Sequence, residues 1–311
     1  MNLSVHSKTT TLFSVLFHVL FPMAFLGSLA GAQPQRERPT RDPATWRWNI
    51  PDSKPHVTHG VVRSNAMNRD VGYNIYLPPR YASHPSMRFP VVYFLHGASG
   101  SEYSDTAMIE WVIPEIEKGT IGDVIYVFVN GGHYSGYRDN AESNVMAETY
   151  LIEELVPAID SRYRTIAEQK GRALFGYSMG GGGGTRLALK YPELFCAVGS
   201  LSGALGWIPQ PDGSTEWADR SENADNIYDW ATRNQEKVRG KIGFYFTVGG
   251  AERLYDRHPP FMAHLKRLDI DFNYRVQAGL DHNLGLSSKL FATEVVRFMA
   301  SHYREAYVPE E

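Results

Sequence analysis

The feature that most restricts the fold of this chain is an alternation of short apolar runs with segments of helical period. The apolar runs, rich in β-branched and aromatic residues, are His59–Arg63, Tyr73–Leu77, Val91–Leu95, Val124–Val129, Arg172–Tyr177, Ala197–Leu201, Ile242–Val248 and Asp271–Val276. Between most of the later runs the apolar residues recur at helical spacing, as in Ala147–Tyr163. This alternation predicts an α/β fold whose mostly parallel sheet of about eight strands carries helices on both faces. The first two runs have no helix between them and predict an antiparallel N-terminal edge hairpin.

The N-terminus has the pattern of a secretion signal. Residues Leu12–Leu29 are mostly apolar and run into Ala30-Gly31-Ala32, a small-x-small sequence that signal peptidase cleaves. A retained membrane anchor is the alternative, but polar residues and Pro22 interrupt a run that is already near the minimum length for spanning a bilayer. We therefore interpret residues 1–32 as a signal peptide and expect a secreted or periplasmic protein, without a stable membrane span after cleavage.

The segment after the leader and the overall composition limit the remaining organisation. Residues 33–55 are rich in proline and arginine and predict a linker without regular structure, followed by one large domain at 56–311. Removing the leader with its one lysine changes the formal net charge from −3 to −4, so nucleic acid is not an expected partner. Cys196 is the only cysteine, which excludes an internal disulfide and a cysteine-based metal site. The oligomeric state has no signal in the sequence.

A serine lies between a predicted strand and a helical segment expected at Thr185–Tyr191. The sequence Gly176-Tyr177-Ser178-Met179-Gly180 matches the nucleophile-elbow pattern, in which flanking glycines let the serine take a strained conformation at a helix N-terminus. A glycine-rich phosphate-binding turn is the alternative, but no lysine follows the glycines as a P-loop requires. We therefore predict Ser178 as a nucleophile. Gly182–Gly184 should each weaken the helix by about 1 kcal/mol, which suggests close packing of helix on sheet.

A second glycine motif, His96-Gly97-Ala98-Ser99-Gly100, follows the run Val91–Leu95. In this order before an elbow it is typical of the loop that supplies a backbone N–H to an oxyanion hole. We expect the amides of Ala98 and Met179 to be the two donors. The alternative is that the His-Gly pair simply ends a strand, and His96 itself is expected to be a hydrogen-bonded structural residue.

The base and the acid of a serine triad should follow the nucleophile in the order acid, then histidine. Of the histidines after Ser178, only His282 lies in a loop between the last strand and the last helix, where a triad base belongs. The loop after Ile242–Val248 offers Glu252 and Asp256 as the acid, and Glu252 is favoured because it lies closer to the strand end. Asp281 is too near His282 in sequence to orient its ring and ranks third.

With these motifs in place, the chain from Arg63 to Tyr303 resembles an esterase family of the α/β-hydrolase fold that includes feruloyl and acetylxylan esterases, tributyrin esterases, S-formylglutathione hydrolases, siderophore esterases and mycolyltransferases. The resemblance is carried by Leu95-His96-Gly97, Glu153-Glu154-Leu155-Val156-Pro157, Gly176-Tyr177-Ser178-Met179-Gly180-Gly181, Tyr191-Pro192-Glu193-Leu194-Phe195, Gly250-x-Glu252-x-Leu254-Tyr255 and Gly279-x-x-His282.

The resemblance implies an α/β-hydrolase catalytic domain over 56–311. In relatives the acid is usually Asp at the position of Glu252, although Glu occurs among the mycolyltransferases. The segment Tyr137-Arg138-Asp139 resembles a loop that borders the acyl pocket in tributyrin-type relatives, and an ordinary polar loop fits the residues equally well.

The expected activity is hydrolysis of carboxylic esters through Ser178, His282, Glu252 and an acyl-enzyme, with no cofactor and no metal. Export favours a small-molecule or polysaccharide ester, with carbohydrate-linked feruloyl or acetyl xylan esters foremost. Siderophore esters, short-chain aliphatic esters and acyl transfer to a sugar acceptor remain alternatives. A non-catalytic binding protein is disfavoured because the serine, the histidine and the oxyanion loop are all intact.

Overall fold

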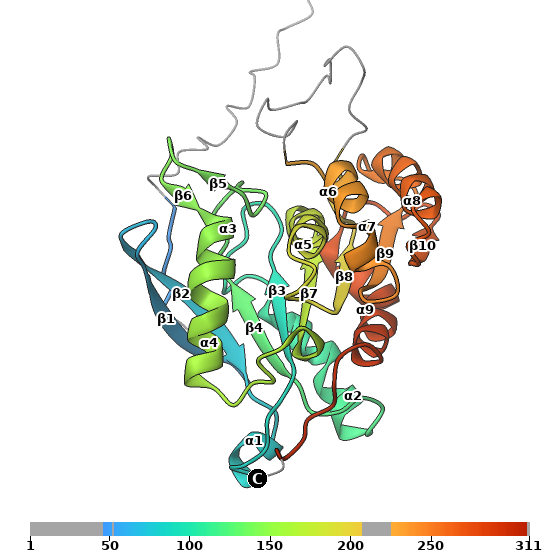
Figure 1. The fold of residues 1–311 in the computed structure, drawn as a ribbon. Coiled ribbons are helices and arrows are strands. Elements are labelled where there is room, and N and C mark those ends of the chain that lie inside the picture. The colour runs from blue at the N-terminus through green and yellow to red at the C-terminus, as the bar shows by residue number, and fades with distance from the viewer. Residues whose placement is uncertain (1–45, 52, 207–224, 310–311) are drawn as a thin grey trace, which may run out of the picture. The chain divides into compact units, whose positions relative to one another are not determined.

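The fold is taken from a computed structural model that describes residues 46–51, 53–206 and 225–309 (Figure 1). The predicted signal peptide and residues 33–45 and 52 of the predicted linker lie outside the described residues. Within the described ranges, no helix combines the length and the apolar character needed to cross a membrane.

An eight-stranded sheet forms the centre of the described structure, with strand order β1-β2-β4-β3-β7-β8-β9-β10. The strands are β1 Thr58–Ser64, β2 Arg69–Tyr76, β3 Val91–Leu95, β4 Ile125–Val129, β7 Arg172–Tyr177, β8 Ala197–Leu201, β9 Gly243–Gly249 and β10 Asn273–Gln277. Strands β1 and β2 form an antiparallel hairpin at one edge, β2 pairs antiparallel with β4, and all other pairs are parallel. The predicted α/β-hydrolase architecture, with its edge hairpin, is confirmed. A separate small ribbon pairs β5 Asp139–Asn140 with β6 Val145–Met146.

Helices cover both faces of this sheet (Figure 1). One core contains side chains of α3 Ala147–Thr149, the π-helical turn η3 Tyr150–Leu155, α4 Val156–Arg162, α5 Met179–Lys190, α6 Ile227–Arg233, α7 Gln235–Val238 and α8 His258–Arg267. The other contains side chains of η2 Thr106–Trp111 and α9 Leu284–Ala300, with α2 Ile113–Glu117 packed against it. The remaining short elements are α1 Arg80–Ser83, η4 Gln169–Gly171 and η5 Tyr255–Arg257.

Strand β3 shows why the central runs are continuously apolar. Val91, Tyr93 and Leu95 belong to one core, while Val92 and Phe94 belong to the other, as expected when successive side chains point to opposite faces. Because both faces are covered by helices, no position of β3 can be polar without burying a polar group. Strand β10, at the far edge, is mostly exposed.

The described part of the predicted linker packs against the domain. Residues 46–51 and 53–55 form no helix or strand, and Trp48 is only 7% exposed and belongs to the first core. The Trp48 carbonyl accepts the N–H of Gly72 at 2.7 Å, which joins this segment to β2. These residues therefore belong structurally to the domain that follows them.

Candidate active site

Ser178 lies between β7 and α5 in a conformation that glycine neighbours make possible. Its backbone has φ 52° and ψ −112°, a region that non-glycine residues rarely occupy. A Cβ at Gly176 would lie 2.4 Å from the Gly180 backbone, and a Cβ at Gly180 would lie 1.9 Å from the Leu95 carbonyl oxygen. The chain can therefore turn this sharply beside β3 only without these side chains.

Helix α5 begins at Met179, and not at Thr185 as the sequence predicted, so the whole glycine run Gly180–Gly184 is helical. The packing explains this difference. A Cβ at Gly182 would lie 2.2 Å from the Ala204 carbonyl oxygen, and one at Gly183 would lie 2.8 Å from the Tyr137 ring. Close contact with the neighbouring chain outweighs the low helix propensity of glycine.

The structure brings Ser178, His282 and Glu252 together from three separate loops at the carboxyl ends of β7, β10 and β9. His282 Nε2 lies 2.9 Å from Ser178 Oγ, and His282 Nδ1 is hydrogen-bonded to Glu252 Oε2. A carboxylate can only accept, so Nδ1 carries the proton and Nε2 presents its lone pair to the serine hydroxyl. The Tyr177 ring stacks on the His282 ring at 4.9 Å between centroids, which further fixes the imidazole plane.

Glu252 is held as an anion in a buried site. Its side chain is fully buried, and burial alone would raise its pKa. Hydrogen bonds from His282 and from the Gly249 N–H at 2.7 Å outweigh burial and hold the pKa of Glu252 below its ordinary value. The carboxylate is thus both ionised and fixed in orientation.

The two predicted oxyanion donors lie beside Ser178, one at the start of α5 and one on the loop that follows β3. Met179 is the first residue of α5, where an N–H has no intrahelical carbonyl to meet. Ala98 is exposed, and the turn after it has Ser99 at φ 67° with its N–H donated to the His133 carbonyl at 2.9 Å. A Cβ at Gly97 would lie 3.6 Å from Ser178 Cβ, so this loop passes directly beside the serine.

His96 supports this loop as a neutral imidazole. Its Nε2 accepts the Gly131 N–H at 3.1 Å, so the proton is on Nδ1, which donates to the Gly97 carbonyl at 2.7 Å. Burial lowers the pKa of His96 to about 4, so this tautomer persists at neutral pH. The contacts agree with the structural role expected for His96.

Proteins of known sequence and structure resemble this chain. Residues 64–263 match a family model described as "Putative esterase". The chain belongs to this esterase family. An esterase of Mycobacterium tuberculosis is 32% identical over 156 residues, which cover 49% of this chain and 33% of that protein. An endo-1,4-beta-xylanase/feruloyl esterase of Xylanibacter ruminicola is 32% identical over 174 residues, covering 50% of this chain and 23% of that protein.

A solved structure of a ferulic acid esterase superposes with a TM-score of 0.69 at 24% identity, covering 79% of this chain and 97% of that chain. The matched part of this chain spans only about a third or less of the curated relatives named above. The family model and the superposition together give the family and the fold of the chain.

The other two acidic candidates are exposed, in contrast to the buried Glu252. Asp256 is in η5, one turn beyond Glu252, and its side chain is exposed; Asp281 is also exposed. His258 is buried against the Gly203 carbonyl, with Nε2 to oxygen at 3.0 Å, and burial lowers the pKa of His258 to about 4. His264 hydrogen-bonds the Tyr228 carbonyl on the helical layer.

The segment Tyr137-Arg138-Asp139 divides into two structural roles. Tyr137 is fully buried at φ 56°, with its hydroxyl 3.4 Å from the His96 carbonyl, so it packs against the loop that begins at His96. Asp139 accepts the backbone N–H groups of Glu148 and Thr149 and so caps the start of α3. Sequence reasoning also missed the stacking of Tyr177 on His282, because the elbow motif does not specify the residue at that position.

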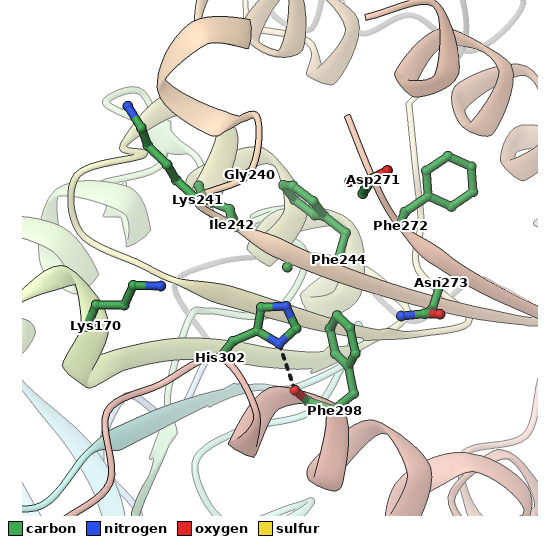
Figure 2. A pocket seen from close by; sticks show the side chains of 11 residues that line it. Lys170, Gly240, Lys241, Ile242, Phe244, Asp271, Phe272, Asn273, Phe298 and His302 are labelled. Atoms are coloured by element: carbon green, nitrogen blue, oxygen red, sulfur yellow. Dashed lines mark hydrogen bonds between the residues drawn. The ribbon is translucent and has the colours of Figure 1, made fainter. Parts of the chain in front are cut away.

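A cavity of about 420 Å³ lies at the amino ends of β9 and β10 (Figure 2). It opens between the start of β9, the start of β10 and the end of α9, and is lined by Phe244, Asn273, Phe298 and His302 among others. Ser178, His282 and Glu252 follow the carboxyl ends of their strands, so this cavity is separate from the candidate active site. Within the described ranges, no cluster of three or more His, Cys, Asp or Glu side chains is placed to hold a metal ion.

Proposed function

We propose that this esterase is a secreted or periplasmic serine hydrolase in which Ser178 is the nucleophile, His282 the general base and Glu252 the acid that orients the imidazole. The observation that carries the proposal is the continuous hydrogen-bond path from Ser178 Oγ through both ring nitrogens of His282 to the buried Glu252 carboxylate. The strained backbone of Ser178 supports it, because strain of this kind concentrates at functional sites.

The first half-reaction forms an acyl-enzyme. Ser178 Oγ bonds to the ester carbonyl carbon while His282 Nε2 takes the hydroxyl proton, and the oxyanion formed faces the N–H groups of Ala98 and Met179. When the tetrahedral intermediate collapses, the bond to the alcohol breaks and the imidazolium gives its proton to the departing oxygen. Glu252 stabilises the imidazolium without taking the proton.

The second half-reaction repeats these steps with water. His282 deprotonates the water, whose oxygen attacks the acyl carbon, and the bond to Ser178 Oγ breaks as that oxygen regains its proton. The products are a carboxylic acid and free enzyme. No step requires a cofactor or a metal ion.

For the substrate we propose a carbohydrate-linked ester of the feruloyl or acetyl xylan type. The printed name of the Xylanibacter ruminicola relative includes feruloyl esterase, and the superposing structure is a ferulic acid esterase. Export through the leader at residues 1–32 would bring the enzyme to polymeric esters outside the cell.

The test combines active-site labelling with a substrate panel. The wild-type protein should react with an alkyl fluorophosphonate and hydrolyse feruloyl-arabinose or acetylated xylan faster than a short aliphatic ester, whereas Ser178→Ala should fold normally and do neither. Labelling that survives in Ser178→Ala would refute the nucleophile. A preference for aliphatic or siderophore esters, or acyl transfer to added sugar in place of hydrolysis, would refute the proposed substrate class or reaction.

Export has a separate measurement. In cells that express the full-length gene, mass spectrometry of the mature protein should find an N-terminus at Gln33, and the protein should appear in the periplasm or medium. A retained Met1 in the membrane fraction would identify an anchor instead.

A further inference from the structure

The segment Trp46–Ile50, here termed the N-terminal arm, is bound to the carboxamide of Asn130, which is fully buried at the end of β4. Asn130 Oδ1 accepts the Trp46 indole N–H at 2.9 Å and the Gly132 N–H at 3.2 Å. Asn130 Nδ2 donates to the Arg47 carbonyl at 3.0 Å and to Glu102 Oε2 at 2.7 Å. All four hydrogen-bonding positions of this amide are used, so its orientation is fixed from both sides.

Glu102 is the second attachment of the N-terminal arm. Its carboxylate is fully buried and accepts the Ile50 N–H at 2.8 Å with one oxygen and Asn130 Nδ2 with the other. Its own carbonyl accepts from Asn74 of β2 at 3.0 Å. Removing an N–H donor from a buried carboxylate lowers the free energy of unfolding, because the acceptor is then left without a partner. These hydrogen bonds therefore hold the arm in place.

The loop that follows Asn130 supports the oxyanion loop. The Gly131 N–H donates to His96 Nε2, and the His133 carbonyl accepts the Ser99 N–H at 2.9 Å. These two bonds flank Ala98 on either side in the sequence. The Trp46 ring lies 4.8 Å from the His133 ring and 6.4 Å from the His96 ring, centroid to centroid, so the arm touches both supports.

We propose that the N-terminal arm is a positioning segment for the ester hydrolysis reaction: through Asn130 it holds residues 131–133, and through them the Ala98 amide, where the oxyanion forms. The inference depends on the proposed role of Ala98 as an oxyanion donor. A donor contributes fully to catalysis only when it is fixed within a few tenths of an ångström of the developing charge. Loosening the arm should therefore weaken transition-state binding and leave ground-state binding of the ester nearly unchanged.

The first test is Trp46→Phe, which removes the indole N–H but keeps an aromatic ring against His133. Asn130 Oδ1 retains the Gly132 N–H, so the variant should fold. We expect kcat to fall about tenfold with KM within about twofold, because a displaced donor costs less than the 10²–10³ of a deleted one. The inhibition constant of an aryl trifluoromethyl ketone, which forms an oxyanion adduct with the serine, should rise by the same factor as kcat falls.

The matched control is Trp230→Phe. The Trp230 indole N–H donates to Asp225 Oδ1 at 2.6 Å, and Asp225 retains Lys190 as a partner in the variant, so the same kind of bond is lost on α6. Its kcat and ketone inhibition should equal those of the wild type. If both tryptophan variants lose kcat equally, or if the loss in Trp46→Phe disappears at temperatures well below its Tm, the arm contributes only stability and the proposal is wrong.

A second variant tests the other attachment. Glu102→Gln replaces one acceptor oxygen by an NH2 donor, which cannot satisfy both the Ile50 N–H and Asn130 Nδ2. It should show the same parallel loss of kcat and ketone affinity. Wild-type kinetics in both Trp46→Phe and Glu102→Gln would overturn the arm's role while leaving Ser178 chemistry intact. If the wild-type enzyme neither hydrolyses esters nor binds the ketone, the proposed function itself fails.

Discussion

Two buried glutamates, Glu252 and Glu148, differ in the partners that keep them ionised. Burial would raise the pKa of each, and in each case neighbouring groups outweigh burial and lower it. Glu252 is bonded to the imidazole of His282, whose charge can change during a reaction. Glu148 is bonded to Arg186 at 2.7 Å and Lys190 at 2.6 Å, whose charges are fixed at neutral pH.

Helix α5 connects the two regions, because it begins beside the candidate active site and carries the cationic partners of Glu148. Helix α5 begins directly after Ser178, and its other end carries Arg186 and Lys190. Arg186 is 1% exposed and also contacts Asp225 at 2.7 Å and the Tyr137 carbonyl at 2.6 Å, so it ties α5 to α3 and to the segment that leads into α6. Disrupting Glu252 should therefore affect rate, and disrupting the Arg186 cluster should affect the free energy of unfolding.

The largest expected effect is on the rate. Glu252→Ala should lower kcat by about 10⁴ with little change in KM, because the imidazole loses the group that fixes its tautomer. Asp256→Ala, which removes an exposed carboxylate one turn further on, should cost far less. Steady-state kinetics with an aryl ester measures both. The reverse ranking would assign the acid to Asp256.

The next largest effect is expected on the free energy of unfolding, when Glu148 loses its partner Arg186. Arg186→Met should lower the free energy of unfolding by about 3–5 kcal/mol, because it leaves two carboxylates without their buried partner. Urea denaturation measures this, and the turnover per folded molecule should stay within a few-fold of wild type. Arg275→Met, which removes an exposed ion pair with Glu294, serves as the control and should cost far less, because solvent screens exposed pairs. Equal costs would show that the Arg186 cluster is no more than a surface network.

The buried histidines extend the comparison to pH. His96 and His258 have pKa values lowered to about 4 in the folded protein, below the ordinary value of 6.5, so the unfolded chain binds more protons between these limits. The stability that these two neutral histidines contribute is therefore fully present above about pH 6.5. It is lost as the pH falls toward 4, by about 3 kcal/mol per histidine. Urea midpoints at pH 7 and pH 4.5 measure the loss. His258→Gln should remove about half of it, and an unchanged pH dependence would show that His258 does not contribute.

The smallest effect compares two glycines of α5. Gly182→Ala should destabilise the protein, since its Cβ would lie 2.2 Å from the Ala204 carbonyl oxygen. Gly184→Ala has its nearest contacts at 3.4 and 3.5 Å with side chains, so it should raise the free energy of unfolding by up to about 1 kcal/mol through helix propensity. Thermal unfolding of both variants decides this, and a loss of Tm in Gly184→Ala would contradict it.

The sequence predicted the central strands closely because strands covered on both faces must be continuously apolar. Strands β3, β7 and β8 have the predicted bounds, whereas the edge strand β10 begins two residues later than expected, at Asn273, where the pattern is weak. The start of α5 could not be predicted, because five successive glycines have low helix propensity and only contacts such as that between Gly182 and Ala204 reveal the reason for them.

The residues of the candidate site also differ in whether the sequence could predict them. Ser178, His282 and Glu252 could be named from motif spacing, since each follows a strand at the same edge of a parallel sheet. Asn130 and the N-terminal arm could not, because their role depends on contacts between segments about 84 residues apart and the arm has no periodicity. The two tryptophans at 46 and 48 were the only indication in the sequence that this stretch packs against the domain.

The two ends of the described chain lie at opposite ends of the parallel strands. Trp46 contacts His133 beside the loop that begins at His96, whereas Tyr307 pairs with Arg88, ahead of the first residue of β3. Attaching the protein to a resin or a cell-wall polymer through a residue beside Trp46 would therefore turn the candidate active site toward the support. Attachment through a residue beside Tyr307 would turn the candidate active site toward the solution, so an affinity tag is better placed near that residue.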